Sequence, residues 1–164
     1  MAEGRSMTMD VAGERELVAT RVFDAPRELV WRAYTEAEHI AKWWGPEGFT
    51  TIVPTLELRP GGVWHYCMKS EEWGDAWGKA IYREIVPPER LVYIDMFSDE
   101  EGNSVEGMPE SEVIITFAEQ DGGTLMTSRT VFASTEARAQ VIEMGMEEGM
   151  AETLDKLAEY LTTM

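Results

Sequence analysis

The stretch from Ala133 to Met164 constrains the fold most, because it is the only segment long and periodic enough to form one continuous helix. Its apolar residues recur at steps of three and four, which places them on one helical face. These residues are Met146, Met150, Leu154, Leu157 and Leu161. The sequence therefore predicts a long C-terminal helix whose apolar face packs against the rest of the chain.

Two glycines interrupt this pattern. Gly145 and Gly149 lie four residues apart, where each costs about 1 kcal/mol relative to alanine in a helix. Two explanations are open and compatible. The glycines mark a bend or a close contact with a strand, or their missing side chains leave room for a ligand above the helix.

The preceding chain is rich in strand signals. Glu14 to Phe23 alternates and predicts a first strand, and two short helices follow, one from Leu29 to Tyr34 and one ending at Trp43 and Trp44. Six β-rich runs then lie between proline and glycine turns. The runs are Phe49 to Leu58, Val63 to Ser70, Ala76 to Val86, Leu91 to Phe97, Glu112 to Ala118 and Thr124 to Phe132.

This order predicts an α+β fold. A curved antiparallel sheet of about seven strands would wrap around the C-terminal helix and leave an internal cavity. We predict a flexible N-terminus over residues 1–13 and a single domain over 14–164. Ser98 to Ser111 is polar and glycine-containing, and we interpret it as a long mobile hairpin loop.

The charge balance narrows the partners. Lys and Arg total 14 against 31 Asp and Glu, so the net charge of −17 disfavours nucleic acid and anionic lipid surfaces. Cys67 is the single cysteine, which excludes an internal disulfide. No run approaches the ~18 apolar residues of a membrane span, and no secretory signal is recognisable, so we predict a cytoplasmic protein. A homodimer is compatible with a small β-rich domain.

Several sequence motifs occur in an order typical of one family. They are Phe23 to Trp31, Trp43 to Pro46, Leu58 to Trp64, Tyr82 to Val92 and Gly123 to Leu125. With these motifs the chain resembles the helix-grip (START-like, SRPBCC) superfamily, in the branch named after the C-terminal domain of the heat-shock-protein-90 ATPase activator. The resemblance runs from about Glu14 to the end of the chain.

The resemblance implies a helix-grip fold and, as the leading hypothesis, a non-enzymatic protein that binds a hydrophobic small molecule, such as a lipid or an aromatic metabolite. Two alternatives stay open. Some relatives are polyketide cyclases, which implies an enzyme using the same pocket, and the family name implies a chaperone-associated interaction protein.

Strand alternation and helical periodicity select all but one of the candidate ligand-binding residues, and Trp44, at the end of the second short helix, either forms a lid or seats that helix on the sheet. The candidates are Trp44, Trp64, Tyr66, Tyr82, Glu84, Met126, Ser128, Met146 and Met150. The alternative is that the aromatic and methionine side chains fill an ordinary core. Glu84 shares the face of Tyr82 in this pattern, so it is either a polar anchor or proton acceptor in the pocket, or a structural carboxylate paired with Arg59 or Arg90.

We expect no metal, cofactor or nucleophilic catalytic set. The two histidines, His39 and His65, lie far apart, and His65 with Cys67 supplies too few ligands for a zinc site. The glycine pairs Gly61-Gly62 and Gly122-Gly123 suit turns, because no lysine and helix follow them as in a phosphate-binding loop.

Overall fold

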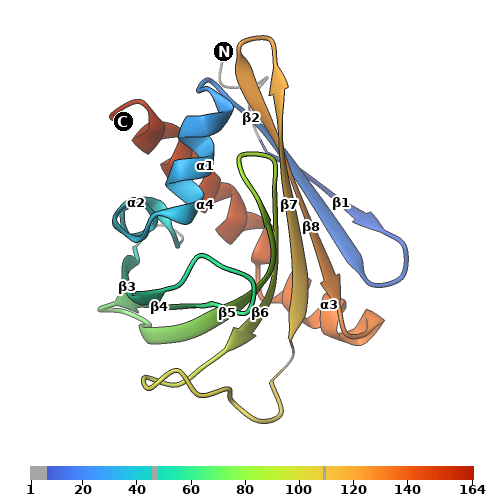
Figure 1. The fold of residues 1–164 in the computed structure, drawn as a ribbon. Helices are drawn as coiled ribbons and strands as arrows, with labels where there is room; N and C mark the ends of the chain where they lie inside the picture. The colour runs from blue at the N-terminus through green and yellow to red at the C-terminus, as the bar shows by residue number, and fades with distance from the viewer. Residues whose placement is uncertain (1–6, 46–47, 109) are drawn as a thin grey trace.

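One antiparallel sheet and four helices make up the computed structural model, which describes residues 7–45, 48–108 and 110–164. The eight strands follow the order β1-β2-β8-β7-β6-β5-β4-β3 across the sheet (Figure 1). They are β1 Thr8–Ala12, β2 Glu16–Phe23, β3 Thr50–Leu56, β4 Val63–Ser70, β5 Gly74–Val86, β6 Arg90–Phe97, β7 Ser111–Gln120 and β8 Gly123–Phe132. The helices are α1 Arg27–Thr35, α2 Ala37–Trp43, α3 Thr135–Glu143 and α4 Met146–Leu161.

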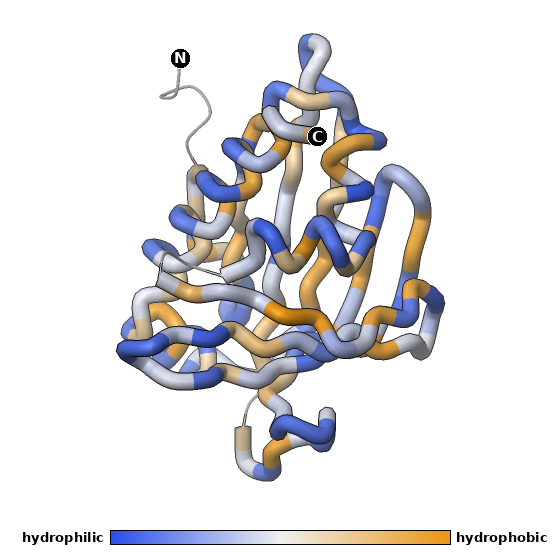
Figure 2. The backbone as a smooth tube through the Cα atoms, turned by 90° about the vertical axis from the view of Figure 1, so that its left-hand side faces the viewer, coloured by the Kyte–Doolittle hydropathy of each residue, from blue (hydrophilic) through white to orange (hydrophobic). Residues whose placement is uncertain are grey.

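The sheet is strongly curved, and α1, α2 and α4 lie together on its concave side (Figure 1). The backbone of α4 lies nearer to α1 and α2 than to the strands. Viewed from the helices, their turns alternate between hydrophilic and hydrophobic residues, as expected for elements with one face turned to the interior (Figure 2). This arrangement confirms the predicted α+β helix-grip fold.

The C-terminal segment is two helices rather than the single predicted one. Gly145, at the start of α4, has a φ of +87°, a left-handed conformation that only glycine adopts at little cost. The chain therefore turns between α3 and α4. Ser134 caps α3, since its hydroxyl oxygen accepts a hydrogen bond of 3.0 Å from the backbone N–H of Ala137.

The N-terminal prediction is wrong for residues 8–12, which form strand β1 instead of a flexible segment. β1 pairs only with β2, and its side chains are largely exposed. A short edge strand of this kind lacks the apolar alternation that identifies a half-buried strand in a sequence. Residues 1–6 of the predicted flexible N-terminus lie outside the described residues.

The packed core lies at one end of the space between sheet and helices. Leu154, Leu157 and Leu161 of α4 are buried there, as the helical stripe predicts. Trp43 of α2 is also buried, and its indole N–H donates a hydrogen bond of 2.9 Å to the carbonyl of Ala33. Met146, on the first turn of α4, is only half-buried, so the N-terminal part of the apolar stripe of α4 lies outside the packed core.

A β-bulge in β5 places Glu84 on the opposite sheet face from the one predicted. Tyr82 pairs with Tyr93 but Glu84 pairs with Val92, so Arg83 is an extra residue in β5. The insertion turns Glu84 to the sheet face opposite Tyr82. There its side chain is 47% exposed, and its carboxylate accepts a hydrogen bond of 2.8 Å from Nε of Arg90. The structure thus supports the structural alternative for Glu84, with Arg90 as the partner.

Candidate ligand-binding cavity

A cavity of about 640 Å³ lies between the concave face of the sheet and α4. Its wall is largely aromatic and aliphatic, which is typical of small-molecule sites of this size. The apolar wall is formed mainly by Trp43, Trp44, Tyr66, Met68, Tyr93, Met96, Phe97, Val113, Ile115, Phe132, Met146, Met150 and Leu154. Serine and threonine hydroxyls of β7 and β8 add polar groups, at Ser111, Ser128 and Thr130.

Asp95 is the most unusual residue of the wall. It lies on β6 between Tyr93 and Phe97, which also line the cavity, and its Oδ1 accepts a hydrogen bond of 3.1 Å from Oη of Tyr66. Burial raises the pKa of Asp95 to about 6, although the hydrogen bonds from Tyr66 and from the backbone N–H of Met96 oppose this shift. Part of its surface stays accessible because the side chain borders the cavity.

Tyr66 keeps its proton at neutral pH. Burial raises the pKa of the Tyr66 phenol well above its ordinary value, and the nearby Asp95 charge raises it further. The phenol is therefore a hydrogen-bond donor to the carboxylate. The mostly apolar wall thus contains one carboxylate acceptor, Asp95, hydrogen-bonded to one aromatic side chain, Tyr66.

Gly78 makes room for the Tyr66 ring. Gly78 of β5 is the cross-strand neighbour of Tyr66, and a Cβ at this position would lie 2.6 Å from Oη of Tyr66. Real Cβ atoms do not approach oxygen so closely, so any larger residue would displace the phenol. The glycine thus holds the geometry of the Tyr66 and Asp95 pair.

The predicted site residues divide between the cavity and its surroundings. Five of the nine line the cavity, and they come from the C-terminal end of α2, from α4 and from both halves of the sheet. These five are Trp44, Tyr66, Ser128, Met146 and Met150.

Three others belong to the packed core instead: Trp64, Tyr82 and Met126 are almost fully buried and do not line the cavity. Met126 Sδ accepts a hydrogen bond of 3.0 Å from the hydroxyl of Tyr34 in that core. For these three side chains the alternative of an ordinary core applies. Glu84 lies outside both the core and the cavity.

The nine candidate residues do not include Asp95 or Gly149, although room for a ligand is one of the two explanations that the sequence offers for Gly149. Alternation places Asp95 with Tyr93 and Phe97 on one face of its strand, and an acid between two inward aromatic residues is a usable signal. Gly149 lines the cavity, and a Cβ at this position would meet no heavy atom within 4 Å. Of the two explanations for the glycines, the bend therefore applies to Gly145 and the open space to Gly149.

The segment from Ser98 to Ser111 borders the cavity. Its first part is tied to the sheet, since Nε2 of His65 lies 3.1 Å from the carbonyl oxygen of Asp99 and the Lys79 ammonium donates a hydrogen bond of 3.0 Å to the carbonyl of Gly102. Val105 and Met108 in its second part are exposed and also line the cavity. The predicted hairpin loop thus forms part of the cavity wall.

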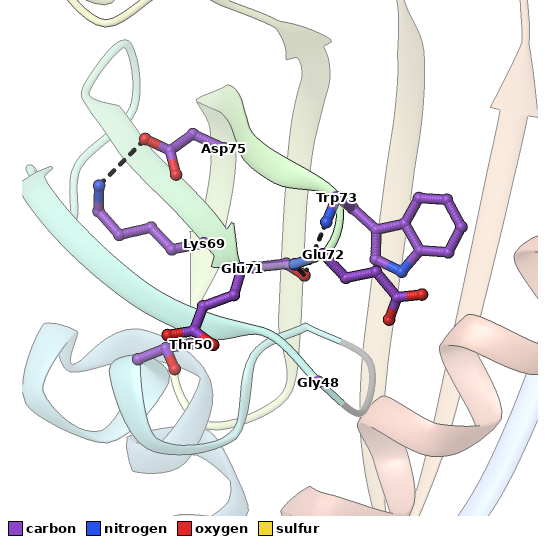
Figure 3. A pocket seen from close by; sticks show the side chains of 8 residues that line it. Gly48, Thr50, Lys69, Glu71, Glu72, Trp73 and Asp75 are labelled. Atoms are coloured by element: carbon purple, nitrogen blue, oxygen red, sulfur yellow. Dashed lines mark hydrogen bonds and ion pairs between the residues drawn. The ribbon is translucent and has the colours of Figure 1, made fainter.

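A second hollow of about 730 Å³ lies at the turn between β4 and β5 (Figure 3). All its lining residues except Ser70 are exposed. Lys69 and Asp75 pair with each other across 3.1 Å, and Trp73 is exposed at the turn. This hollow is larger but open to solvent and charged, so the internal cavity is the better candidate for an apolar ligand.

Among the described residues, Glu36, Glu38 and His39 place one potential metal ligand each within 4.8 Å of one another. His39 already contacts protein groups, with Nδ1 2.6 Å from the Tyr160 hydroxyl and Nε2 3.3 Å from a Glu36 carboxylate oxygen. No helix of the described residues is long and apolar enough to cross a membrane.

A curved antiparallel sheet that closes a cavity against a C-terminal helix defines the class of the protein, which is a helix-grip domain. The model of one protein family, described as Activator of Hsp90 ATPase homolog 1-like protein, matches residues 24–162. The chain belongs to this family. The match confirms the branch of the superfamily that the sequence motifs indicate.

Solved structures agree with this assignment. Protein Ms6760 from Mycobacterium smegmatis is 30% identical, with a TM-score of 0.85 over 96% of this chain and 99% of that chain. A protein from Arthrobacter aurescens is 28% identical, with a TM-score of 0.88 over 96% and 92%. CalU16 from Micromonospora echinospora, 23% identical with a TM-score of 0.60 over 96% and 84%, shares the fold. No curated protein matches the chain.

Proposed function

We propose that the protein binds a hydrophobic small molecule in the cavity between the sheet and α4. The observation that carries the proposal is a cavity of about 640 Å³ whose wall is mostly apolar. Burial of apolar surface in such a site contributes roughly 25 cal/mol per Å², so an apolar ligand gains affinity without many polar contacts. Methionine side chains at Met68, Met96, Met146 and Met150 adapt the wall to irregular ligands.

The experiment is native mass spectrometry of the purified protein, followed by denaturation, organic extraction and identification of the released compounds. We expect an apolar compound in near-stoichiometric amount. If the protein is empty, thermal unfolding against a set of lipids and aromatic compounds replaces the extraction, with ligand-dependent stabilisation as the expected result. An empty protein that no member of the set stabilises would contradict the proposal.

Acid–base catalysis in the same cavity is the second candidate function. Asp95, with its pKa raised to about 6, and the protonated Tyr66 favour it, because a general base works best when its pKa is near the operating pH. Aromatic or polyketide-like substrates would fit the wall. The test compares conversion of such compounds, followed by mass spectrometry, between the natural protein and Asp95→Asn. Conversion that is equal in both would exclude Asp95 as the base.

Two further predictions remain proposals. The chaperone-associated alternative is tested by adding the protein to the heat-shock-protein-90 ATPase, whose rate would change. The homodimer is tested by the mass of the native protein in the same mass-spectrometry experiment.

A further inference from the structure

We infer that the cavity selects ligands that carry a protonated amine on an apolar or aromatic body, with Asp95 as the counter-ion. The inference rests on the proposed function and names the chemical class of its ligand. It follows from the signs of the charges in the wall, the position of Asp95 and the aromatic surfaces around it.

The described wall residues carry charge of one sign. They include three carboxylates, Asp75, Asp95 and Glu110, of which Asp75 is paired with Lys69, and no lysine, arginine or histidine. Lys156 of α4 is outside the wall, and its ammonium donates a hydrogen bond of 3.1 Å to the carbonyl of Gly45. An anionic ligand would therefore bring its charge into a poorly hydrated space without a cationic partner, which is strongly unfavourable.

Asp95 is incompletely paired for a buried carboxylate. A carboxylate accepts about four hydrogen bonds, whereas the side chain of Asp95 accepts one from Tyr66 and one from the backbone N–H of Met96. Its neighbours across the strands, Ala80 and Ser111, supply no charge. A ligand ammonium would donate the missing hydrogen bonds to the carboxylate and so replace those to water that it loses on folding.

Aromatic rings near Asp95 complement a cation as well. Tyr66 lies within hydrogen-bond distance of Asp95, and its ring is 5.7 Å from that of Trp44, which also lines the cavity. Faces of tryptophan and tyrosine attract ammonium groups and stack on aromatic bodies. The same wall therefore offers a counter-ion, cation–π surfaces and an apolar lining.

The test uses three probes with the same aromatic body: naphthylethylamine, naphthylethanol and naphthylacetic acid. Titration calorimetry at pH 8 should show that the natural protein binds the amine about tenfold or more tighter than the alcohol, and the acid most weakly. Asp95→Asn, which keeps the size of the side chain and an acceptor for Tyr66, should bind amine and alcohol equally. Glu110→Gln, at an exposed wall residue, is the matched control and should keep the preference.

A second measurement avoids dependence on the folding of the variant. The titratable groups that face Asp95 are the phenols of Tyr66 and Tyr93, both protonated throughout this range because their pKa values are raised. The residues of β7 and α4 that line the cavity near it carry no charge. The amine preference of the natural protein should therefore fall between pH 8 and pH 5, as Asp95 becomes protonated while the amine stays charged.

Equal binding of amine and alcohol by the natural protein, or a preference that survives in Asp95→Asn, would overturn this inference and leave the proposed function standing. Failure of all three probes to bind would also overturn it. If the extraction experiment then finds no apolar ligand either, the proposed function fails as well.

Discussion

The two glycines of the C-terminal segment give a matched pair of substitutions with opposite expected effects. Gly149 lies in α4, and a Cβ there would have no heavy atom within 4 Å, so alanine should stabilise the helix by about 0.5–1 kcal/mol. Gly145 has a φ of +87°, so alanine should cost about 1–2 kcal/mol. For a chain of this length, ~1 kcal/mol shifts the melting temperature by roughly 2–4 °C.

Calorimetric melting should therefore show Gly149→Ala about 1–4 °C above the natural protein and Gly145→Ala about 2–8 °C below it. If Gly145→Ala raised the melting temperature, the left-handed break between α3 and α4 would be wrong, and if Gly149→Ala lowered it, the open space beside Gly149 would be wrong.

A larger residue at Gly149 tests the cavity itself. Gly149→Phe would place a ring in the space beside Met146 and Met150, whereas Gly149→Ala leaves most of it open. At a ligand concentration of about 100 times the Kd, the natural protein gains about 2.7 kcal/mol, and Gly149→Ala should gain the same. Gly149→Phe should lose most of this gain in thermal unfolding with the extracted compound, or with naphthylethanol. An unchanged gain would place the ligand elsewhere.

Three further predictions concern the sheet. Gly78→Ala should destabilise the protein by about 1–3 kcal/mol in urea unfolding, because the new methyl group overlaps Tyr66. Glu84→Gln should change stability by less than about 1 kcal/mol and leave ligand binding intact, because its ion pair with Arg90 is exposed. Asp95 has a folded-state pKa of about 6 against an unfolded value near 3.8, so its protonated form favours folding. As the pH rises from about 4 to about 6, the natural protein should lose up to about 3 kcal/mol of unfolding free energy relative to Asp95→Asn. A difference in unfolding free energy that does not change with pH would contradict the burial of Asp95.

Elements with strong boundaries in the sequence are predicted well. The strand from Val63 to Ser70 has the same bounds in the structure, because glycines precede it and a polar turn follows it. The sequence offers a bend as one explanation for Gly145 and Gly149, but it does not show which of the two glycines breaks the helix, because only the φ angle of Gly145 decides this. Local periodicity identifies a helix more reliably than it identifies where the helix ends.

Strand alternation assigns faces correctly until the bulge in β5. Tyr82 points inward as predicted, but the extra residue Arg83 reverses the faces of everything after it, including Glu84. A one-residue insertion leaves the hydrophobic pattern nearly unchanged and depends on pairing with β6. The sequence of β5 alone therefore could not show that Glu84 leaves the interior.

The division between core and cavity depends on tertiary packing, which periodicity and alternation do not give. Leu157 and Met150 belong to one helical stripe, yet Leu157 is buried in the core and Met150 lines the cavity. The difference arises because α4 packs against α1 and α2 and leaves space toward the strands. An inward acid such as Asp95 is costly in a packed core and tolerable beside a cavity. The presence of Asp95 on an inward face is therefore itself evidence, readable from the sequence, that the interior at this point is not filled by side chains.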